Sequence, residues 1–189
     1  IMVTITIDGK QISVDENLSI LEAAQEADVK IPTLCYLKDV NEVGACKMCV
    51  VEVEGSRHLV TSCNTKVKEG MVVNTHSERV VNSRKQVLNM LLANHDVRCF
   101  SCSKSGDCRY GITKSCYPGS AAKFEAKKEN PFLTYYPELC INCQRCVSTC
   151  NKVSCNGTLH NSKIGTRTLI DAPFGPDWKE TDCESCGNC

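Results

Sequence analysis

The chain has 189 residues, of which sixteen are cysteine, and its twenty-two Lys and Arg balance its twenty-two Asp and Glu. Such a cysteine density is typical of a disulfide scaffold or a metal protein, while the balanced charge argues against a nucleic-acid partner. No apolar run approaches the roughly 18 residues that a membrane-spanning helix needs, and no secretion signal is recognisable at the start. We therefore predict a cytoplasmic, reduced protein without direct membrane insertion.

Residues 1–75 have the pattern of a small mixed sheet with one helix. Asp8-Gly9 separates two alternating apolar runs and predicts the turn of a β-hairpin. Ser19 followed by Glu22 forms a capping-box pattern, which predicts a helix that ends near Asp28. The predicted strands lie at residues 3–7, 12–14, 50–54, 58–60 and 71–73.

The first group of cysteines lies between the predicted helix and the later strands. Its spacing is C-x10-C-x2-C-x13-C, whose first interval is longer than in the plant-type [2Fe–2S] pattern C-x4-C-x2-C. Gly44 and Ala45 would let backbone N–H groups approach cluster sulfurs. The alternative is a set of buried or zinc-binding cysteines, although a zinc site usually pairs two C-x2-C knuckles. The candidate ligands are Cys35, Cys46, Cys49 and Cys63.

Residues 76–130 begin with a predicted amphipathic helix that Ser77 caps. Its apolar stripe runs from Val80 to Leu92, and we expect the side chains on the other face to be solvated. A second solvated helix is predicted over Ala121–Glu129, which is rich in Ala, Lys and Glu. On the first helix, the side chains expected to be exposed to solvent are those of Arg79, Arg84 and Lys85.

A second ligand group follows the first of these helices. His95 precedes Cys99, Cys102 and Cys108 in an H-x3-C-x2-C-x5-C arrangement. Imidazole can coordinate iron in such centres, but a fourth thiolate from Cys116 would make an all-cysteine site, and spacing alone does not exclude it.

Residues 131–189 carry two cysteine runs of the bacterial ferredoxin type. The first is C-x2-C-x2-C-x3-C from Cys140 to Cys150, and the second is C-x2-C-x2-C from Cys183 to Cys189. In two-cluster ferredoxins the fourth cysteine of the first run ligates the other cluster. This rule assigns one [4Fe–4S] cluster to Cys150, Cys183, Cys186 and Cys189 and a second one to Cys140, Cys143 and Cys146. The second set would take its fourth ligand from beyond Cys189, so we expect a fragment of a longer polypeptide.

Together these blocks, with Glu42–Val53 around the first group and Leu91–His95 before the second, resemble a known module. It is the N-terminal iron–sulfur module shared by the large iron–sulfur subunit of respiratory complex I, multi-cluster [FeFe]-hydrogenases and NAD-dependent formate dehydrogenases. The resemblance implies one [2Fe–2S] cluster on the first group, a His/Cys3 [4Fe–4S] cluster on the second and a two-cluster ferredoxin domain after it. It also implies that His95, rather than Cys116, is the fourth ligand of the second group.

The resemblance predicts an α+β fold with three parts. Residues 1–75 would form a β-grasp [2Fe–2S] ferredoxin-like domain, residues 76–130 a helical His/Cys3 segment, and residues 131–189 a two-[4Fe–4S] bacterial ferredoxin-like domain that is incomplete at its C-terminus. The extra cysteines Cys116 and Cys155 have no family role, and we expect both to be small buried side chains.

The function expected from these clusters is electron transfer. The sequence has no Gly-rich dinucleotide fingerprint and no nucleophile–base set, so we expect substrate chemistry in another domain or subunit. The resemblance implies a relay between a flavin/NAD(H) subunit or ferredoxin and a hydrogenase or formate dehydrogenase centre. The alternatives are a free-standing polyferredoxin and a structural zinc protein.

Overall fold

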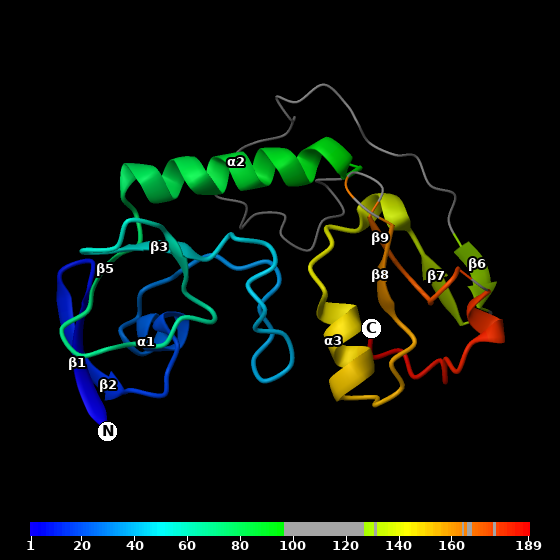
Figure 1. Cartoon of the computed structure of the whole chain (residues 1–189), viewed down its shortest axis with the longest axis horizontal. Helices are drawn as coiled ribbons and strands as arrows, with labels where there is room; N and C mark the ends of the chain where they lie inside the picture. Colours follow the sequence, from blue (N-terminus) through cyan, green and yellow to red (C-terminus); the bar gives the residue numbers. More distant parts are fainter. Residues whose placement is uncertain (97–126, 131, 164, 166–167, 176) are drawn as a thin grey trace. The chain divides into compact units, whose positions relative to one another are not determined.

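The structure is a computed structural model of the whole chain, in which residues 1–96, 127–130, 132–163, 165, 168–175 and 177–189 are described. The described chain divides into two compact units, coloured by sequence in Figure 1. Unit 1 comprises Ile1–Tyr36 and Glu42–Val87, and unit 2 comprises Leu37–Asn41 and Leu88–Cys189.

Unit 1 is built on a five-stranded mixed sheet with the strand order β2-β1-β5-β3-β4. The hairpin of β1 and β2 turns at Asp8 and Gly9, whose φ angles of 48° and 82° are left-handed, as a two-residue hairpin turn requires. β5 pairs parallel to β1 and antiparallel to β3, so the sheet is mixed, as predicted. The strands are β1 (Met2–Ile7), β2 (Lys10–Asp15), β3 (Val50–Val53), β4 (Val60–Thr61) and β5 (Val72–Asn74).

The helix α1 (Ile20–Glu26) packs against the core of this sheet. The predicted capping box is present: the Ser19 hydroxyl accepts the Glu22 N–H, and the Glu22 carboxylate accepts the Ser19 N–H at 2.8 Å. These bonds satisfy two amides that have no partner within the helix. The buried face of α1 consists of Ile20, Leu21, Ala23 and Ala24.

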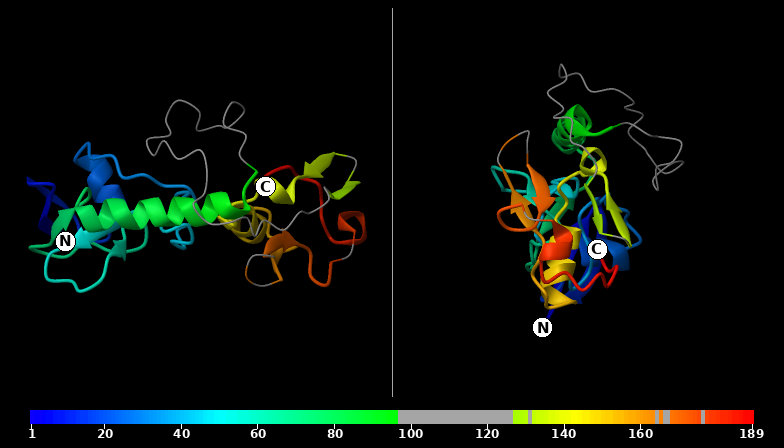
Figure 2. Two further views of the ribbon diagram at one scale, coloured as in Figure 1. Left: turned by 90° about the horizontal axis from the view of Figure 1, so that it is seen from above. Right: turned by 90° about the vertical axis from the view of Figure 1, so that its right-hand side faces the viewer.

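The helix α2 (Glu78–Asn94) is one unbroken helix, as Figure 2 shows. The prediction that Arg84 is solvated is wrong. Its side chain is only 3% exposed, and its guanidinium donates to the Val50 carbonyl at 2.7 Å. A charged donor aimed at a backbone carbonyl offsets the cost of burial. Arg79, in contrast, lies at the surface and pairs with Glu52.

Unit 2 has short elements and a small core. The hydrophobic cluster at its centre consists of Leu159, Ile170, Ala172 and Trp178. The described residues of this unit form two two-stranded sheets and three short helical segments. They are β6 (Lys127–Asn130), β7 (Leu133–Tyr135), η2 (Pro137–Leu139), α3 (Arg145–Lys152), β8 (His160–Ser162), β9 (Leu169–Asp171) and η4 (Trp178–Glu180).

The helix predicted over Ala121–Glu129 is corrected where the structure describes it. Residues 127–129 belong to β6, which pairs antiparallel with β7, because cross-strand pairing overrides local helix propensity. Residues 121–126 lie outside the described part of the chain. Among the helices that the structure does describe, none is long and apolar enough to cross a membrane.

Candidate iron–sulfur centres

Four buried thiols gather in unit 1. Cys46 and Cys49 precede β3, Cys63 follows β4, and Cys35 lies in the loop after α1. The antiparallel pairing of β3 with β4 brings Cys49 and Cys63 together, with their sulfurs 3.4 Å apart. None of the four forms a disulfide, and each side chain is at most 7% exposed.

Hydrogen bonds among these thiols divide them into two pairs. A hydrogen bond from Cys35 lowers the pKa of Cys46 to about 5, and one from Cys63 lowers the pKa of Cys49 to about 6. The same bonds raise the pKa values of the other two thiols, Cys35 and Cys63. Thiolate is the form that binds metal, and a low pKa favours it at Cys46 and Cys49.

The backbone around this first site turns sharply beside the cysteines. Lys47 is left-handed at φ 56°, and the next N–H, that of Met48, donates to the Cys46 sulfur at 3.5 Å. Gly44 is left-handed at φ 64°, and a Cβ there would lie 3.0 Å from the Asn64 side-chain nitrogen. A glycine is needed here because it adopts this positive φ without strain and because a Cβ would press against Asn64.

The two C-x2-C-x2-C runs of unit 2 have the same backbone design. Asn142 and Gln144 are left-handed two and four residues after Cys140, and Ser185 and Gly187 are left-handed at the same offsets from Cys183. Three of these four residues are not glycine, and non-glycine residues held at positive φ concentrate at functional sites. In the first run this turn lets the Asn142 N–H donate to the Cys140 sulfur at 3.4 Å.

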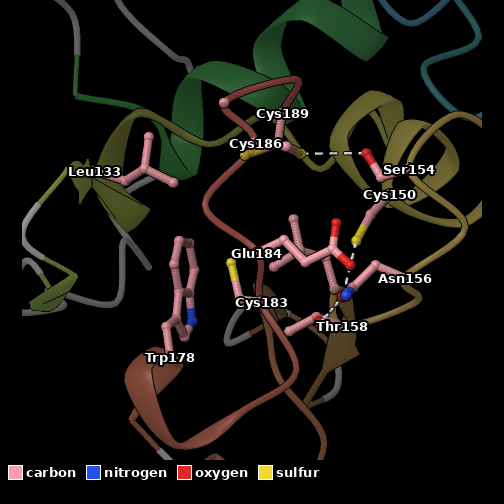
Figure 3. Close-up of a pocket in the computed structure, with 12 residues that line it drawn as sticks. Leu133, Cys150, Ser154, Asn156, Thr158, Trp178, Cys183, Glu184, Cys186 and Cys189 are labelled. Carbon is pink, nitrogen blue, oxygen red and sulfur yellow. Dashed lines mark hydrogen bonds between the residues drawn. The ribbon is translucent and has the colours of Figure 1, made fainter.

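One pocket in unit 2 gathers cysteines from both runs (Figure 3). The helix α3 contributes Cys150, and the C-terminal run contributes the other thiols. The Ser154 hydroxyl lies 3.2 Å from the Cys186 sulfur and lowers the pKa of that thiol. The cysteines lining the pocket are Cys150, Cys183, Cys186 and Cys189, which is the set that the ferredoxin rule assigns to one cluster.

Cys140, Cys143 and Cys146 occupy the turn before α3 and its first residues. Cys140 and Cys146 pack beside the small core, and burial raises the pKa of both thiols, that of Cys146 to about 11. Thiols protonated in this way need a strong cation to become thiolate, and iron supplies one.

His95 follows the last residue of α2. Its Nδ1 is buried and has no hydrogen-bond partner among the described residues. Burial lowers the pKa of His95, while the nearby Asp96 carboxylate and Leu139 backbone offset part of that effect. A metal-binding histidine needs one ring nitrogen without a protein partner, and Nδ1 meets that need among the described residues. The other candidate ligands of this group, Cys99, Cys102 and Cys108, lie outside the described residues, as does the alternative fourth ligand Cys116.

Within the described residues, no three His, Cys, Asp or Glu side chains converge closely enough to hold a single metal ion. A cluster makes a different demand, because its ligands are distributed over two or four irons and do not converge on a single ion. The free thiols, the N–H groups aimed at sulfur and the unpartnered His95 nitrogen therefore fit iron–sulfur clusters.

The burial of Cys155 is a third sequence expectation that the structure corrects. We predicted a small buried side chain, but Cys155 is exposed. It follows α3 at a left-handed φ of 53°, and its sulfur lies 3.8 Å from the Lys152 carbonyl oxygen at the surface.

Sequence reasoning missed two polar groups that approach the cysteines. The hydroxyl of Ser154 lies 3.2 Å from the Cys186 sulfur, and the amide oxygen of Asn156 lies 4.0 Å from the Cys150 sulfur. Ser154 and Asn156 follow Cys150 closely, and that proximity was the available signal.

Comparison with known proteins bears on two of the cysteine groups. Residues 1–78 match the family described as 2Fe-2S iron-sulfur cluster binding domain. Residues 84–109, which include His95, match the NADH-ubiquinone oxidoreductase-G iron-sulfur binding region. The predicted resemblance is confirmed. The chain thus contains a [2Fe–2S] ferredoxin-like domain and a [4Fe–4S] binding region.

Similar proteins take part in several oxidoreductase systems. The chain is 41% identical to the NADP-reducing hydrogenase subunit HndD of Solidesulfovibrio fructosivorans over its full length, which is 34% of that subunit. It is 30% identical to the putative formate dehydrogenase SH0748 of Staphylococcus haemolyticus, across 98% of this chain and 19% of that protein. The chain therefore spans about a third of the length of HndD and a smaller share of the formate dehydrogenase.

A solved structure has a similar fold. An NAD+-reducing [NiFe]-hydrogenase in the H2-reduced state superposes with a TM-score of 0.80 at 29% identity, covering 90% of this chain and 75% of that one. The similarity thus extends beyond residues 1–109, the span of the two family matches.

Proposed function

We propose that this chain is an electron-relay module that holds one [2Fe–2S] cluster and three [4Fe–4S] clusters. Its parts would be a β-grasp domain, a His/Cys3 segment and a two-cluster ferredoxin-like domain. The ligand sets are Cys35, Cys46, Cys49 and Cys63 for the [2Fe–2S] cluster, and His95, Cys99, Cys102 and Cys108, then Cys150, Cys183, Cys186 and Cys189, then Cys140, Cys143 and Cys146 for the [4Fe–4S] clusters.

The observation that carries this proposal is the repeated backbone of the two cysteine turns in unit 2. Both place left-handed residues at the same two positions, Asn142 and Gln144 in one turn and Ser185 and Gly187 in the other. A repeated strained turn is costly, so a shared ligand is the simple reason to build it twice. The pocket that joins Cys150 to the second run supports the exchange of the fourth ligand between the two sites.

The residues of this chain would bind the clusters, orient them and limit their contact with water. A bound iron–sulfur cluster supplies a site that accepts and releases one electron. Backbone N–H groups such as those of Met48 and Asn142 donate toward ligand sulfurs, which favours the more negative, reduced state. Burial of Cys35, Cys46, Cys49 and Cys63 keeps water from the first site.

We also propose that the relay connects a flavin/NAD(H)-binding subunit or ferredoxin to a hydrogenase or formate dehydrogenase centre. The support is the function named for the similar proteins, which include an NADP-reducing hydrogenase subunit and a putative formate dehydrogenase. The chemistry of hydrogen or formate would then take place on residues other than these.

Reductive titration tests the relay directly. The anaerobically purified protein should take up about four electrons per chain, one for each cluster, as dithionite bleaches its visible absorption. A colourless protein that takes up no electrons and contains zinc would overturn the proposal.

A further inference from the structure

Asn41 is a buried polar residue on a tight turn in the long interval between Cys35 and Cys46. It is 0% exposed. Its N–H donates to the Leu37 carbonyl at 2.7 Å, and the Leu37 N–H donates to the Asn41 carbonyl at 3.1 Å. Asp39, between them, is left-handed at φ 63°. These bonds fix the backbone from which the Asn41 carboxamide projects.

Both ends of that carboxamide bond to other residues of unit 2, to which Asn41 itself belongs. Its Nδ2 donates to the Cys143 carbonyl at 3.0 Å, and its Oδ1 accepts the Ser148 hydroxyl at 2.7 Å. A carbonyl oxygen only accepts hydrogen bonds, so the NH2 end must face Cys143. Cys143 lies in the first cysteine turn (Cys140–Cys146) and Ser148 lies in α3, so one side chain joins the turn to the helix that follows it.

The Cys143 carbonyl is a part of the turn that needs such a hold. Cys143 lies between Asn142 and Gln144, which are left-handed at φ 53° and 68°. Left-handed residues other than glycine are strained, and they persist only where their surroundings hold them. The hydrogen bond from Asn41 reaches the middle of this strained segment from 102 residues earlier in the chain.

The second cysteine turn (Cys183–Cys189) has a comparable hydrogen bond. Asn130, the last residue of β6, is 9% exposed, and its Nδ2 donates to the Ser185 hydroxyl oxygen at 2.8 Å. Its Oδ1 accepts the Phe132 N–H at 2.9 Å, so both ends of this carboxamide are also used. Ser185 is itself left-handed, at φ 52°. Each turn is therefore bonded, at or beside a left-handed residue, to a buried asparagine from outside its cysteine run.

We propose that Asn41 and Asn130 are positioning residues that hold the two cysteine turns in the conformation that ligates the clusters. Asn41 holds the first turn through Cys143, and Asn130 holds the second through Ser185. Neither asparagine is a ligand, because each acts through the residue that it bonds. This inference rests on the proposed function, since it concerns two clusters of that relay. Because each turn has its own asparagine, loss of one hydrogen bond affects one cluster.

The test is the rate at which each cluster loses iron to a chelator in the anaerobically purified protein, followed by EPR. In Asn41→Ala the cluster of the first turn should lose iron about tenfold faster, because residues that orient ligands strengthen metal binding by at least this factor. In Asn130→Ala the faster loss should instead occur at the second turn. Cys143→Ala and Cys186→Ala, which each remove a ligand of one set, identify the two signals. Equal acceleration of both clusters in either variant would overturn the inference.

Three further variants separate the hydrogen bond to Cys143 from packing. Asn41→Asp keeps the size of the side chain and an acceptor for Ser148 but has no N–H for Cys143, so it should lose iron as fast as Asn41→Ala. A wild-type rate in Asn41→Asp would overturn the inference. Ser148→Ala leaves the donor in place and should have a smaller effect, which is not additive with Asn41→Ala. Asn151→Ala is the matched control and should keep the wild-type rate, because exposed Asn151 bonds the Val147 carbonyl of its own helix.

Two readouts on the loaded protein locate the effect. In Asn41→Ala, amide exchange should rise around Cys143 and in the first turn of α3, and exchange in the second cysteine turn should stay unchanged. The g values of the affected cluster should also change, because its ligand is oriented differently. A wild-type protein without cubane signals would refute the proposed function itself. Cubane signals with unchanged iron loss in both alanine variants would refute only the role of the asparagines.

Discussion

In unit 1 the candidate ligands Cys35, Cys46, Cys49 and Cys63 are at most 7% exposed, whereas in unit 2 Cys186 and Cys189 are exposed and Cys140 to Cys150 are half-buried. The first set is covered by a five-stranded sheet and a helix with a large apolar core. In the described part of unit 2, the hydrophobic cluster beside the second set has four buried members. We therefore expect the first site to lie in a fold that has its own stability, and the second to depend on its ligand to hold the chain together.

Removal of iron should therefore affect the two units unequally, and this is the largest effect we expect. After anaerobic chelation, amide exchange should rise strongly in α3, β8 and β9, because binding free energy is folding free energy there. Amides of β1 and β5 should remain protected by the sheet. Hydrogen–deuterium exchange with mass spectrometry measures both regions in one sample, and equal loss of protection in both would contradict the comparison.

The independence of unit 1 can also be tested from its core. Ile5→Ala removes a side chain that is 1% exposed and should lower the free energy of unfolding of this unit by about 2–5 kcal/mol. Val72→Ala, at a partly exposed position on the neighbouring strand β5, is the matched control and should cost far less. Denaturant unfolding of the chelated protein, followed by far-UV circular dichroism, measures the difference; a similar cost for both would argue against this core.

Loss of one thiol should remove one cluster without disturbing those of the other unit. Cys49→Ala should eliminate a rhombic [2Fe–2S] EPR signal and leave the cubane signals, because that ligand set shares no residue with the others. Cys155→Ala is the matched control, since Cys155 is exposed and belongs to no proposed ligand set. Disappearance of all signals in Cys49→Ala would show a single cooperative structure instead of two separable ones.

The His95 ligand can be distinguished from Cys116 by a pair of substitutions. His95→Cys should retain one cubane at a lower potential, because a thiolate adds negative charge next to the iron. Cys116→Ser should leave that cubane in place. If Cys116→Ser removed the cluster while His95→Ala left its potential untouched, the all-cysteine site would be correct.

The smallest effect is expected at the exposed end of unit 2. Ser154→Ala removes the hydroxyl 3.2 Å from the Cys186 sulfur, but water can replace that hydrogen bond at an exposed thiol. The oxidised-to-reduced equilibrium of one cubane should therefore shift only about twofold. A shift of about tenfold or more would mean that exposure to water does not weaken this hydrogen bond.

Local signals in the sequence were sufficient where the structure is local. Asp8-Gly9 and the Ser19–Glu22 capping box act within a few residues, so the hairpin and α1 lie where they were predicted. The cysteine spacings likewise encode turns of fixed length. The confirmed resemblance added the family context of the first two groups.

The features that escaped prediction depend on partners far along the chain. Arg84 is buried because its guanidinium reaches Val50, thirty-four residues earlier. Residues 127–129 form a strand because β7 pairs with them, although their composition favours a helix. Tyr135 meets Ile170 thirty-five residues later, so no local pattern could mark it.

The most direct test of the central claim, that this chain is a multi-cluster electron relay, is its metal and sulfide content after anaerobic purification. One [2Fe–2S] cluster and three [4Fe–4S] clusters require about fourteen irons and an equal number of acid-labile sulfides. A protein that lacks the fourth ligand of the Cys140, Cys143 and Cys146 set should retain about ten irons firmly and hold the remainder as a labile or three-iron cluster. Stoichiometric zinc without labile sulfide would contradict the account.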